Sequence, residues 1–289
     1  MRFDPDSSPP LGMGAGAPSS GEVNFLLRVL STVCLGALIA SALFLFPPWL
    51  FNLGACFFIL VGLYEFFTLL RKRGAPCFRL FGVVIGAVIP LVVHFQLGVT
   101  QSGEVLFIVL ACLGLFIIQL SKNENPSALE GIAITFFGIM YVSWFLSYLI
   151  KIRYLAGGEA WIFYLLVVTK VGDMAAYGVG HFFGRHALIP RISPKKSVEG
   201  TGAGLFSSTV ASLCFYGRLP YPLPWTQLLL LGILIGLVGQ CGDLSESLIK
   251  RYCGVKDSGK VIPGMGGVLD IADSVLLTTP LFFFYVKTL

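Results

Sequence analysis

Residues 247–273 read SLIKRYCGVKDSGKVIPGMGGVLDIAD, a short polar segment between two long apolar runs. A glycine-rich turn at 263–267 lies between its two groups of charged residues. Lysine and arginine suit phosphate groups, and carboxylates suit a hard cation such as Mg²⁺. The segment therefore predicts a site that holds phosphates and a divalent metal. Its charged residues are Lys250, Arg251, Lys256, Asp257, Lys260, Asp270 and Asp273.

The composition of the whole chain is that of an integral membrane protein. Of its 289 residues, 56% are hydrophobic and 12% are charged, whereas soluble domains carry about 25% charged residues. Several apolar runs approach or exceed the ~20 residues that a helix needs to cross a bilayer. Backbone groups in lipid must be satisfied within the protein, so we expect an all-α, polytopic membrane protein.

The apolar runs predict about nine transmembrane helices. Residues 1–22 are rich in Pro, Gly and Ser and are predicted to form a disordered tail. Residues 23–150 are expected to form a scaffold of helices, and residues 151–289 a catalytic region that carries most of the motifs. The predicted helices span roughly 24–46, 49–70, 79–98, 104–120, 131–150, 160–183, 202–217, 225–249 and 268–286.

Basic residues in the connecting loops predict the orientation of the chain. With nine passes, three basic loops lie on one side, which the positive-inside rule identifies as the cytoplasm of a bacterial-type inner membrane. The N-terminus is then inside and the C-terminus outside, and Lys151 and Arg153 are weak exceptions on the outer side. The three loops contain Arg71, Lys72, Arg73 and Arg79; Arg185, Arg191, Lys195 and Lys196; and Lys250, Arg251, Lys256 and Lys260.

The first half of the chain carries few polar groups within its apolar runs. Glu65 lies near the inner end of the second predicted helix and His94 near the outer end of the third. Near helix ends, a snorkelling or capped side chain is a better interpretation than a functional one. No internal repeat is visible, which argues weakly against an inverted-repeat transporter.

The predicted helix at 160–183 carries ionisable residues inside an apolar run. Such groups are usually functional or paired, and Lys170 and Asp173 could neutralise each other because they are three residues apart. Tyr177 lies one turn after Asp173 on the same face. Glycines at 172, 178, 180 and 184 would allow another helix or a ligand to approach the backbone.

The loop that follows, residues 193–200, combines lysines with hydroxyl groups. Lys195 and Lys196 suit phosphate as point charges, and Ser197 or Thr201 could cap the next helix to give an anion site. A basic loop can also reflect membrane topology alone, and the glycine spacing is not that of a P-loop.

Two pairs of acidic residues occur at one-turn spacing. Asp243 and Glu246 lie near the end of the helix at 225–249, and Asp270 and Asp273 lie at the start of the last helix. Two carboxylates at this spacing can share Mg²⁺ and leave positions for substrate phosphates. Carboxylates at a helix start can instead interact with the helix dipole, an explanation that does not fit Asp243.

Together these segments resemble the signature of CDP-diacylglycerol synthases (phosphatidate cytidylyltransferases). That signature runs S-x-x-K-R, four residues, K-D, a P-G-H-G-G turn and D-R-x-D. Residues 173–185, 193–200 and 242–247 are similar to the family segments D-x-x-A-Y…F-G-R, S-P-x-K-T-x-E-G and G-D-L-x-E-S. The resemblance covers roughly residues 165–285. The long signature is matched by Ser247, Lys250, Arg251, Lys256, Asp257, Pro263, Gly264, Gly266, Gly267, Asp270 and Asp273.

The chain departs from the family pattern at four positions. Met265 stands where the family usually has His, and Ile271 replaces the Arg of D-R-x-D. Val198 and Lys195 stand where Trp and Gly are common. Met265 cannot donate a hydrogen bond and Ile271 cannot pair with a carboxylate or phosphate, so two potential phosphate or proton partners are missing.

The resemblance implies transfer of CMP from CTP to phosphatidate, giving CDP-diacylglycerol and pyrophosphate. The implied partners are CTP, phosphatidate and membrane lipid, without nucleic acid, and the protein is expected to form a homodimer. One or two Mg²⁺ ions are implied on Asp243, Asp270 and Asp273, with Asp173 or Asp257 in support. Lys250, Arg251, Lys256 and Asp257 are the implied catalytic residues. The implied substrate-binding residues are Asp173, Tyr177, Arg185, Ser193, Lys196, Ser197, Glu199 and Ser247.

Three other interpretations remain open at this stage. A CTP-dependent lipid kinase would transfer the γ-phosphate to a polyprenol or similar alcohol and would release CDP instead of pyrophosphate. A transporter could use Lys170, Asp173 and Asp243 as an ion path, although the charged groups gather on one side and not at mid-membrane. A paralogue could keep the fold and have lost its activity with the missing His and Arg.

Overall fold

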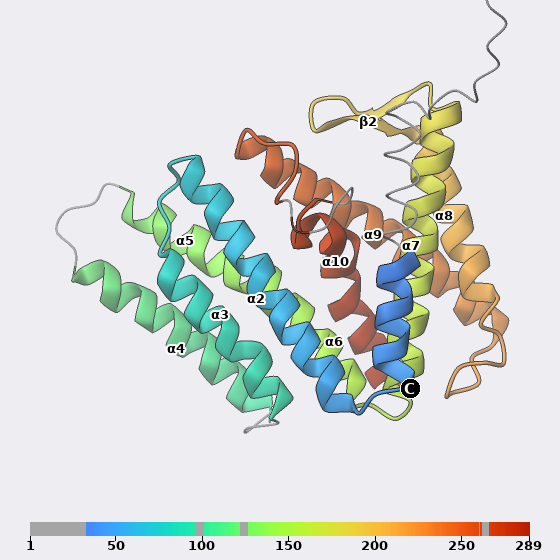
Figure 1. Ribbon diagram of the computed structural model, residues 1–289, viewed down its shortest axis with the longest axis horizontal. Helices are drawn as coiled ribbons and strands as arrows, with labels where there is room; N and C mark the ends of the chain where they lie inside the picture. The colour runs from blue at the N-terminus through green and yellow to red at the C-terminus, as the bar shows by residue number, and fades with distance from the viewer. Residues whose placement is uncertain (1–32, 96–100, 122–126, 260, 262–265) are drawn as a thin grey trace, which may run out of the picture.

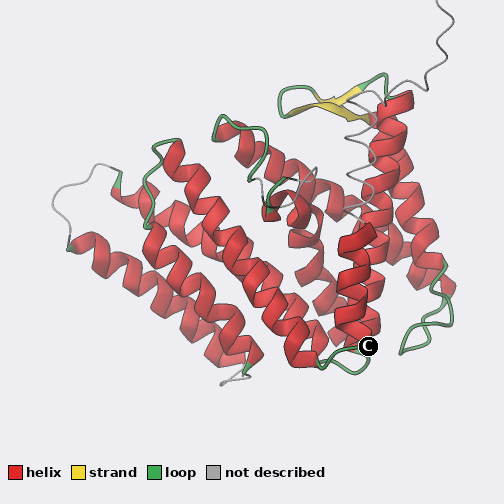
Figure 2. Cartoon of the chain, in the orientation of Figure 1, coloured by secondary structure: helices red, strands yellow, loops and turns green. Residues whose placement is uncertain are grey.

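The protein is described by a computed structural model that covers residues 33–95, 101–121, 127–259, 261 and 266–289. Helices make up most of these residues, and Figure 2 shows one small pair of strands at the edge of the bundle. A helix at Val33–Phe44 comes first. It is followed by α2 (Pro48–Lys72), α3 (Arg79–His94), α4 (Gln101–Leu120), α5 (Ala128–Gly138), the π-helix η1 (Ile139–Trp144), α6 (Phe145–Arg153), α7 (Gly158–Phe183), α8 (Val198–Leu213), α9 (Trp225–Tyr252) and α10 (Val268–Lys287).

Each apolar run predicted to be helical contains a helix in the described part of the chain. Five of these helices are long and apolar enough to cross a membrane: α2, the continuous α5–η1–α6 helix, α7, α9 and α10. Three further helices are apolar but shorter, and α8 belongs to neither group. The all-α membrane fold is therefore confirmed, whereas nine complete membrane passes are not. The predicted disordered tail at 1–22 lies outside the described residues.

Proline and glycine set several helix boundaries. Pro48 occupies the first position of α2, where its missing N–H costs no hydrogen bond. Gly157 precedes α7 with a φ of 66°, a left-handed conformation that favours glycine. These breaks let consecutive helices turn back on one another.

The helices form two neighbouring groups (Figure 1). Helices α2 to α6 lie side by side in one group, and α7 to α10 pack together in the other. Helix α10 joins the two because it contacts α2 and α6 as well as α7 and α9.

Glycines bring the helices of the second group close together. A side chain at Gly172 would collide with the Ser208 hydroxyl on α8, and one at Gly242 would collide with the Asp273 carbonyl on α10. The close approach predicted for the glycine-bearing helix α7 is thus confirmed at Gly172.

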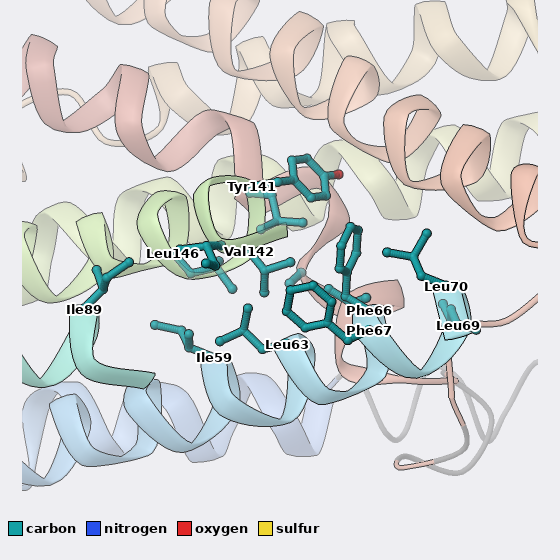
Figure 3. Packing of buried hydrophobic residues seen from close by; sticks show 14 of the residues in the cluster. Ile59, Leu63, Phe66, Phe67, Leu69, Leu70, Ile89, Tyr141, Val142 and Leu146 are labelled. Carbon is teal, nitrogen blue, oxygen red and sulfur yellow. The ribbon is translucent and has the colours of Figure 1, made fainter. Parts of the chain in front are cut away.

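Buried hydrophobic side chains fill the space between α2, α3, η1 and α10. Figure 3 shows Leu63, Phe66 and Phe67 of α2 facing Val142 of η1, with the Tyr141 hydroxyl at the edge of the cluster. A second cluster surrounds Trp161 on α7. These clusters fix how the two groups of helices pack.

The segment predicted as a loop at 193–200 is instead a strand followed by the first turn of α8. Strand β1 (Ala187–Ile189) pairs antiparallel with β2 (Ser193–Ser197), in the register Ala187↔Ser197 and Ile189↔Ser193. The prediction of a plain loop was wrong. The strands pair because their backbone N–H and C=O groups need hydrogen-bond partners, although no alternation of apolar and polar residues marks residues 193–197 as a strand.

Helix α8 begins at Val198, four residues before the predicted start at 202. The Ser197 side chain caps it by accepting a hydrogen bond from the Gly200 N–H at 3.1 Å. Of the two predicted capping residues, the structure therefore uses Ser197 and not Thr201.

The three predicted basic loops lie at one end of the molecule. In Figure 1 the α2–α3 junction, the β1–β2 hairpin and the C-terminal end of α9 are all at the upper end, whereas the C-terminus is at the lower end. This arrangement agrees with the predicted placement of the three loops on a common side.

Candidate active site

Lys170 makes three hydrogen bonds, one within α7 and two that tie α7 to α10. Its ammonium group donates to Asp173 Oδ2 at 3.0 Å, to the Ile271 carbonyl at 2.9 Å and to Ser274 Oγ at 3.0 Å. The Ser274 hydroxyl in turn donates to Asp173 Oδ2 at 2.7 Å. The predicted Lys170–Asp173 pair therefore exists, and it also fixes the start of the last helix.

Asp243 pairs with the hairpin. Its Oδ2 lies 2.5 Å from the Lys196 ammonium, which connects β2 to α9. The Asp243 side chain is 35% exposed and that of Lys196 is 25% exposed, but the Lys196 ammonium nitrogen itself is buried against Asp243. The structure thus brings together two predicted site residues that are 47 positions apart in the sequence.

Lys250 lies between two carboxylates at the end of α9. It forms an ion pair with Glu246 on its own helix and another with Asp270 Oδ1 on α10, at 2.7 Å. The side chains of all three are largely buried. A buried ammonium with two carboxylates is well satisfied, so this group acts as a fixed support.

Asp270 also caps α10. Its Oδ2 accepts hydrogen bonds from the Gly267 N–H at 2.8 Å, from the Ser258 N–H at 2.8 Å and from the Ser258 hydroxyl at 2.9 Å. With Lys250 on Oδ1, both oxygens of this carboxylate are engaged. Gly266, at φ 94°, leaves room for it, since a side chain there would crowd Asp270 Oδ2.

Glu199 holds the turn between α7 and β1. Its Oε1 lies 2.6 Å from His186 Nδ1, and its Oε2 accepts from the backbone N–H groups of Arg185 and His186 at 3.1 and 3.3 Å. The hydrogen bond with the His186 side chain is the main reason why the pKa of Glu199 falls to about 2. Its contacts are those of a residue that shapes the hairpin.

The remaining predicted site residues lie at the same end of the helix bundle as the residues above, or beside it. The Arg251 Nε donates to the Ile192 carbonyl at 3.1 Å, which connects α9 to the hairpin turn. Ser247 is buried, and Ser193 pairs with Ile189 in the hairpin. The Tyr177 ring stacks on His181, with a centroid distance of 6.1 Å. The exposed residues of the set include Arg185, Lys256 and Asp257.

Only part of the predicted metal set is open to an ion. Within the described ranges, no three His, Cys, Asp or Glu side chains are grouped as a ready metal site. Asp270 is occupied by its four donors, whereas Gly242, next to Asp243, packs directly against the Asp273 carbonyl, so Asp243 and Asp273 lie on facing stretches of α9 and α10. Mg²⁺ typically takes one or two carboxylates and completes its shell with water and substrate phosphates. Asp243 and Asp273 therefore fit a Mg²⁺ ion that a bound nucleotide would complete.

Two residues of the first half belong to this region although neither was predicted to be part of a site. Glu65 of α2 is buried and accepts a hydrogen bond from the Leu269 N–H, in the first turn of α10, at 3.0 Å. Of the two interpretations offered for it, the capped side chain agrees with the structure and the snorkelling one was wrong. Tyr141 of η1 is buried within electrostatic range of Glu246, Asp273 and Asp243. The only available signal was a carboxylate in an apolar run for Glu65, and the sequence holds none for Tyr141.

His94, the other polar group noted in the first half, lies away from the site. The Tyr154 hydroxyl donates to the His94 carbonyl at 2.6 Å and lies 3.4 Å from its Nδ1. These contacts agree with the interpretation of His94 as a satisfied group near a helix end.

The helical membrane fold and the cluster of lysines and carboxylates at one end of it suit a membrane protein that acts on phosphate groups. More closely, the chain belongs to the cytidylyltransferase family, whose sequence model matches residues 26–289. This membership identifies the protein as an enzyme and argues against the transporter interpretation.

Similarity to individual proteins extends to the first half of the chain. The chain is 41% identical to the uncharacterized protein YnbB of Escherichia coli over 157 residues, which are 54% of this chain and about half, 52%, of that protein. It is 36% identical to the phosphatidate cytidylyltransferase of Bacillus subtilis over 188 residues, 65% of this chain and 68% of the relative. The corresponding Synechocystis enzyme is 30% identical over 289 residues, which cover 91% of this chain and 96% of that one. The resemblance therefore extends beyond residues 165–285.

Proposed function

We propose that this protein transfers CMP from CTP to phosphatidate and forms CDP-diacylglycerol and pyrophosphate. The observation that carries the proposal is the convergence of the motif residues of α7, the β1–β2 hairpin, α9 and α10 at one end of a membrane bundle. Two relatives that cover about two thirds or more of the chain bear the name phosphatidate cytidylyltransferase, which supports the same reaction.

The reaction follows from the chemistry of the two substrates. A phosphate oxygen of phosphatidate attacks the α-phosphorus of CTP, and the bond from that phosphorus to the bridging oxygen of the β-phosphate breaks. Pyrophosphate leaves with the bonding electrons, and no oxidant or reductant is needed. Both substrates are polyanions, so the site must reduce their repulsion and align them.

The residues of the site would divide this work. Lys196 and Arg251 bring positive charge to the hairpin side of α9, and the exposed Lys256 adds another cation at the end of that helix. These three are placed to hold the triphosphate and the lipid phosphate. Lys250 and Asp270 would keep α9 and α10 in register beneath them.

Asp243 and Asp273 are the residues that would hold Mg²⁺. When bound there, the ion would supply charge screening for the nucleotide and for the departing pyrophosphate. Asp173 stays near this pair because Lys170 and Ser274 fix its carboxylate. Its position suits it to support the ion from the side of α7.

The site would face the cytoplasm, where CTP is made, and its product would enter phospholipid biosynthesis. The three basic loops at the same end of the molecule support this orientation in a bacterial inner membrane. The homodimer remains a prediction from the family resemblance.

The test is a transfer assay with purified protein in detergent, phosphatidate, Mg²⁺ and CTP labelled at the α-phosphate. We expect the label to appear in the organic phase as CDP-diacylglycerol, and to be lost when Mg²⁺ is chelated. A parallel assay with γ-labelled CTP separates this reaction from a lipid kinase, which would move the γ-phosphate into the lipid. No α-label in the lipid, with a characterised relative active under the same conditions, would refute the proposal.

A further inference from the structure

Glu65 contacts residues on both sides of the glycine-rich turn in the signature segment, residues 247–273. Its Oε2 lies 3.0 Å from the Leu269 N–H, which follows this part of the segment, and 3.3 Å from the Ser258 hydroxyl, which precedes it. Leu269 is 204 positions away in the sequence. One carboxylate of the scaffold half thus holds two points of the motif.

The burial of Glu65 makes these contacts energetically important. The side chain sits in α2 with only 6% of its surface exposed, between residues of the hydrophobic cluster. Among the residues that the structure describes, its second oxygen, Oε1, is buried with no hydrogen-bond partner. Burying a carboxylate costs free energy unless its oxygens accept hydrogen bonds, so the two contacts of Oε2 offset part of this cost.

Two glycines of the signature segment make room for the carboxylate. A side chain on Gly267 would place its first carbon 2.6 Å from both Glu65 oxygens, and one on Gly259 would collide with Oε1. The backbone of the segment therefore packs directly on the end of the Glu65 side chain. This contact gives a physical reason for glycine at position 267, next to the start of α10.

Glu65 is linked to the Lys250–Asp270 pair through Ser258. The Ser258 hydroxyl lies 3.3 Å from Glu65 Oε2 and 2.9 Å from Asp270 Oδ2, so it sits between the two carboxylates. Displacement of Glu65 would remove the acceptor of the Leu269 N–H and leave Ser258 held by Asp270 alone. Asp270 and Asp273, both in the first two turns of α10, would move with this end of the helix.

We propose that Glu65 is a positioning residue that anchors the signature segment and the N-terminus of α10 to α2. This proposal rests on the proposed function for its effect on catalysis. Glu65 acts through Ser258, Gly267 and Leu269 and does not touch the substrates. The scaffold half thereby sets the geometry of the site in the other half.

Four full-length variants test the anchor. Glu65→Ala removes the carboxylate, and Glu65→Gln keeps an oxygen that can accept from Leu269. Gly267→Ala crowds the Ser258 hydroxyl and the Glu65 carboxylate together and so disturbs the same contacts while leaving both side chains in place. Asn52→Ala is the matched control, because Asn52 is also a fully buried polar residue of α2 but lies thirteen positions earlier, away from the segment.

Two readouts separate positioning from general stability. In the transfer assay, we expect Glu65→Ala and Gly267→Ala to lower kcat by about 10- to 100-fold, as small misplacements do, with a smaller change in KM for CTP. Limited trypsin cleavage after the exposed Lys256 should become about tenfold faster in both, since cleavage reports local opening. Glu65→Gln should recover most of both properties, and Asn52→Ala should resemble the wild type.

Two results would contradict the proposed role of Glu65. Wild-type kcat and cleavage in Glu65→Ala would overturn the proposal, and so would equal losses in Glu65→Ala and Asn52→Ala. If Glu65→Ala does not fold, Gly267→Ala carries the same comparison. If the wild-type protein transfers no CMP, the proposed function fails, while the trypsin comparison still decides whether Glu65 anchors the segment.

Discussion

The Lys250 ammonium lies 2.7 Å from the Asp270 carboxylate, and this pair joins the last turn of α9 to the first turn of α10. Glu246 contacts the same ammonium from one helical turn earlier. The two helices are therefore locked together at the end where the signature segment connects them. One to two turns earlier in α9, Gly242 packs against the Asp273 carbonyl, so Asp243 on one helix lies beside the Asp273 stretch of the other.

Removal of the ammonium should destabilise the protein strongly. Lys250→Met leaves Glu246 and Asp270 buried without their cation, and loss of one partner from a buried pair costs about 3–5 kcal/mol. Thermal unfolding in detergent should show a clear fall in Tm, and CMP transfer should be lost. Adding Glu246→Gln should restore part of the stability, whereas a surface control, Glu130→Gln, should change little. A Lys250→Met protein as stable as the wild type would contradict the proposed lock.

Asp273 and Asp270 should differ in their response to Mg²⁺. Asp273→Asn weakens a proposed ligand, so we expect the Mg²⁺ concentration for half-maximal transfer to rise by about 10- to 100-fold. Asp270→Asn should instead lower Tm, because Asp270 accepts from Lys250, Ser258 and Gly267. Titration of transfer activity with Mg²⁺ in both variants makes the comparison. The assignment fails if Asp270→Asn shifts the Mg²⁺ requirement and Asp273→Asn leaves it unchanged.

Local patterns allowed correct predictions where the interaction itself is local. Apolar runs predicted the positions of the helices because each membrane helix is formed by one contiguous apolar segment. The three-residue spacing of Lys170 and Asp173 predicted their ion pair. The β1–β2 hairpin was missed because β1 has only three residues and the basic strand β2 carries no alternation of apolar and polar residues. The number of complete membrane passes also does not follow from hydropathy, since α8 is helical but lies outside the candidate spans.

The features that the sequence did not predict depend on contacts between segments that are distant in the sequence. Asp270 and Asp273 share one-turn spacing, which predicted a shared cation, but the structure gives them different partners. Asp270 is occupied by Lys250 and by the segment before α10, while Asp273 Oδ1 accepts from the Ser274 N–H at 2.6 Å. The role of Glu65 depends on a neighbour 204 positions away, and no pattern within one helix reports such a contact.

Glu199 should make the thermal stability of the protein depend on pH in the acid range. Its pKa falls from the usual 4.5 to about 2 because the His186 side chain, and then backbone N–H groups, favour the ionised carboxyl. A depressed carboxyl pKa stabilises the fold above pH 4.5, and that contribution is lost as the pH falls from about 4.5 toward 2. Tm of wild type and Glu199→Gln, measured from pH 7 to pH 2, should therefore differ at neutral pH and converge in acid. A constant difference across this range would show that the ionised carboxyl does not stabilise the turn.

Tyr141 carries a buried hydroxyl that has no hydrogen-bond partner in the described structure. It projects from the π-helical turn η1, a type of irregularity that is frequent at functional sites. An unsatisfied buried hydroxyl costs about 1–3 kcal/mol, so Tyr141→Phe should raise Tm if its ring keeps its stacking on Phe137. Because the hydroxyl lies within electrostatic range of Asp243 and Asp273, we also expect slower CMP transfer. Thermal unfolding and the transfer assay on the same preparation test both effects, and a variant with lower Tm and unchanged turnover would show that the hydroxyl serves packing alone.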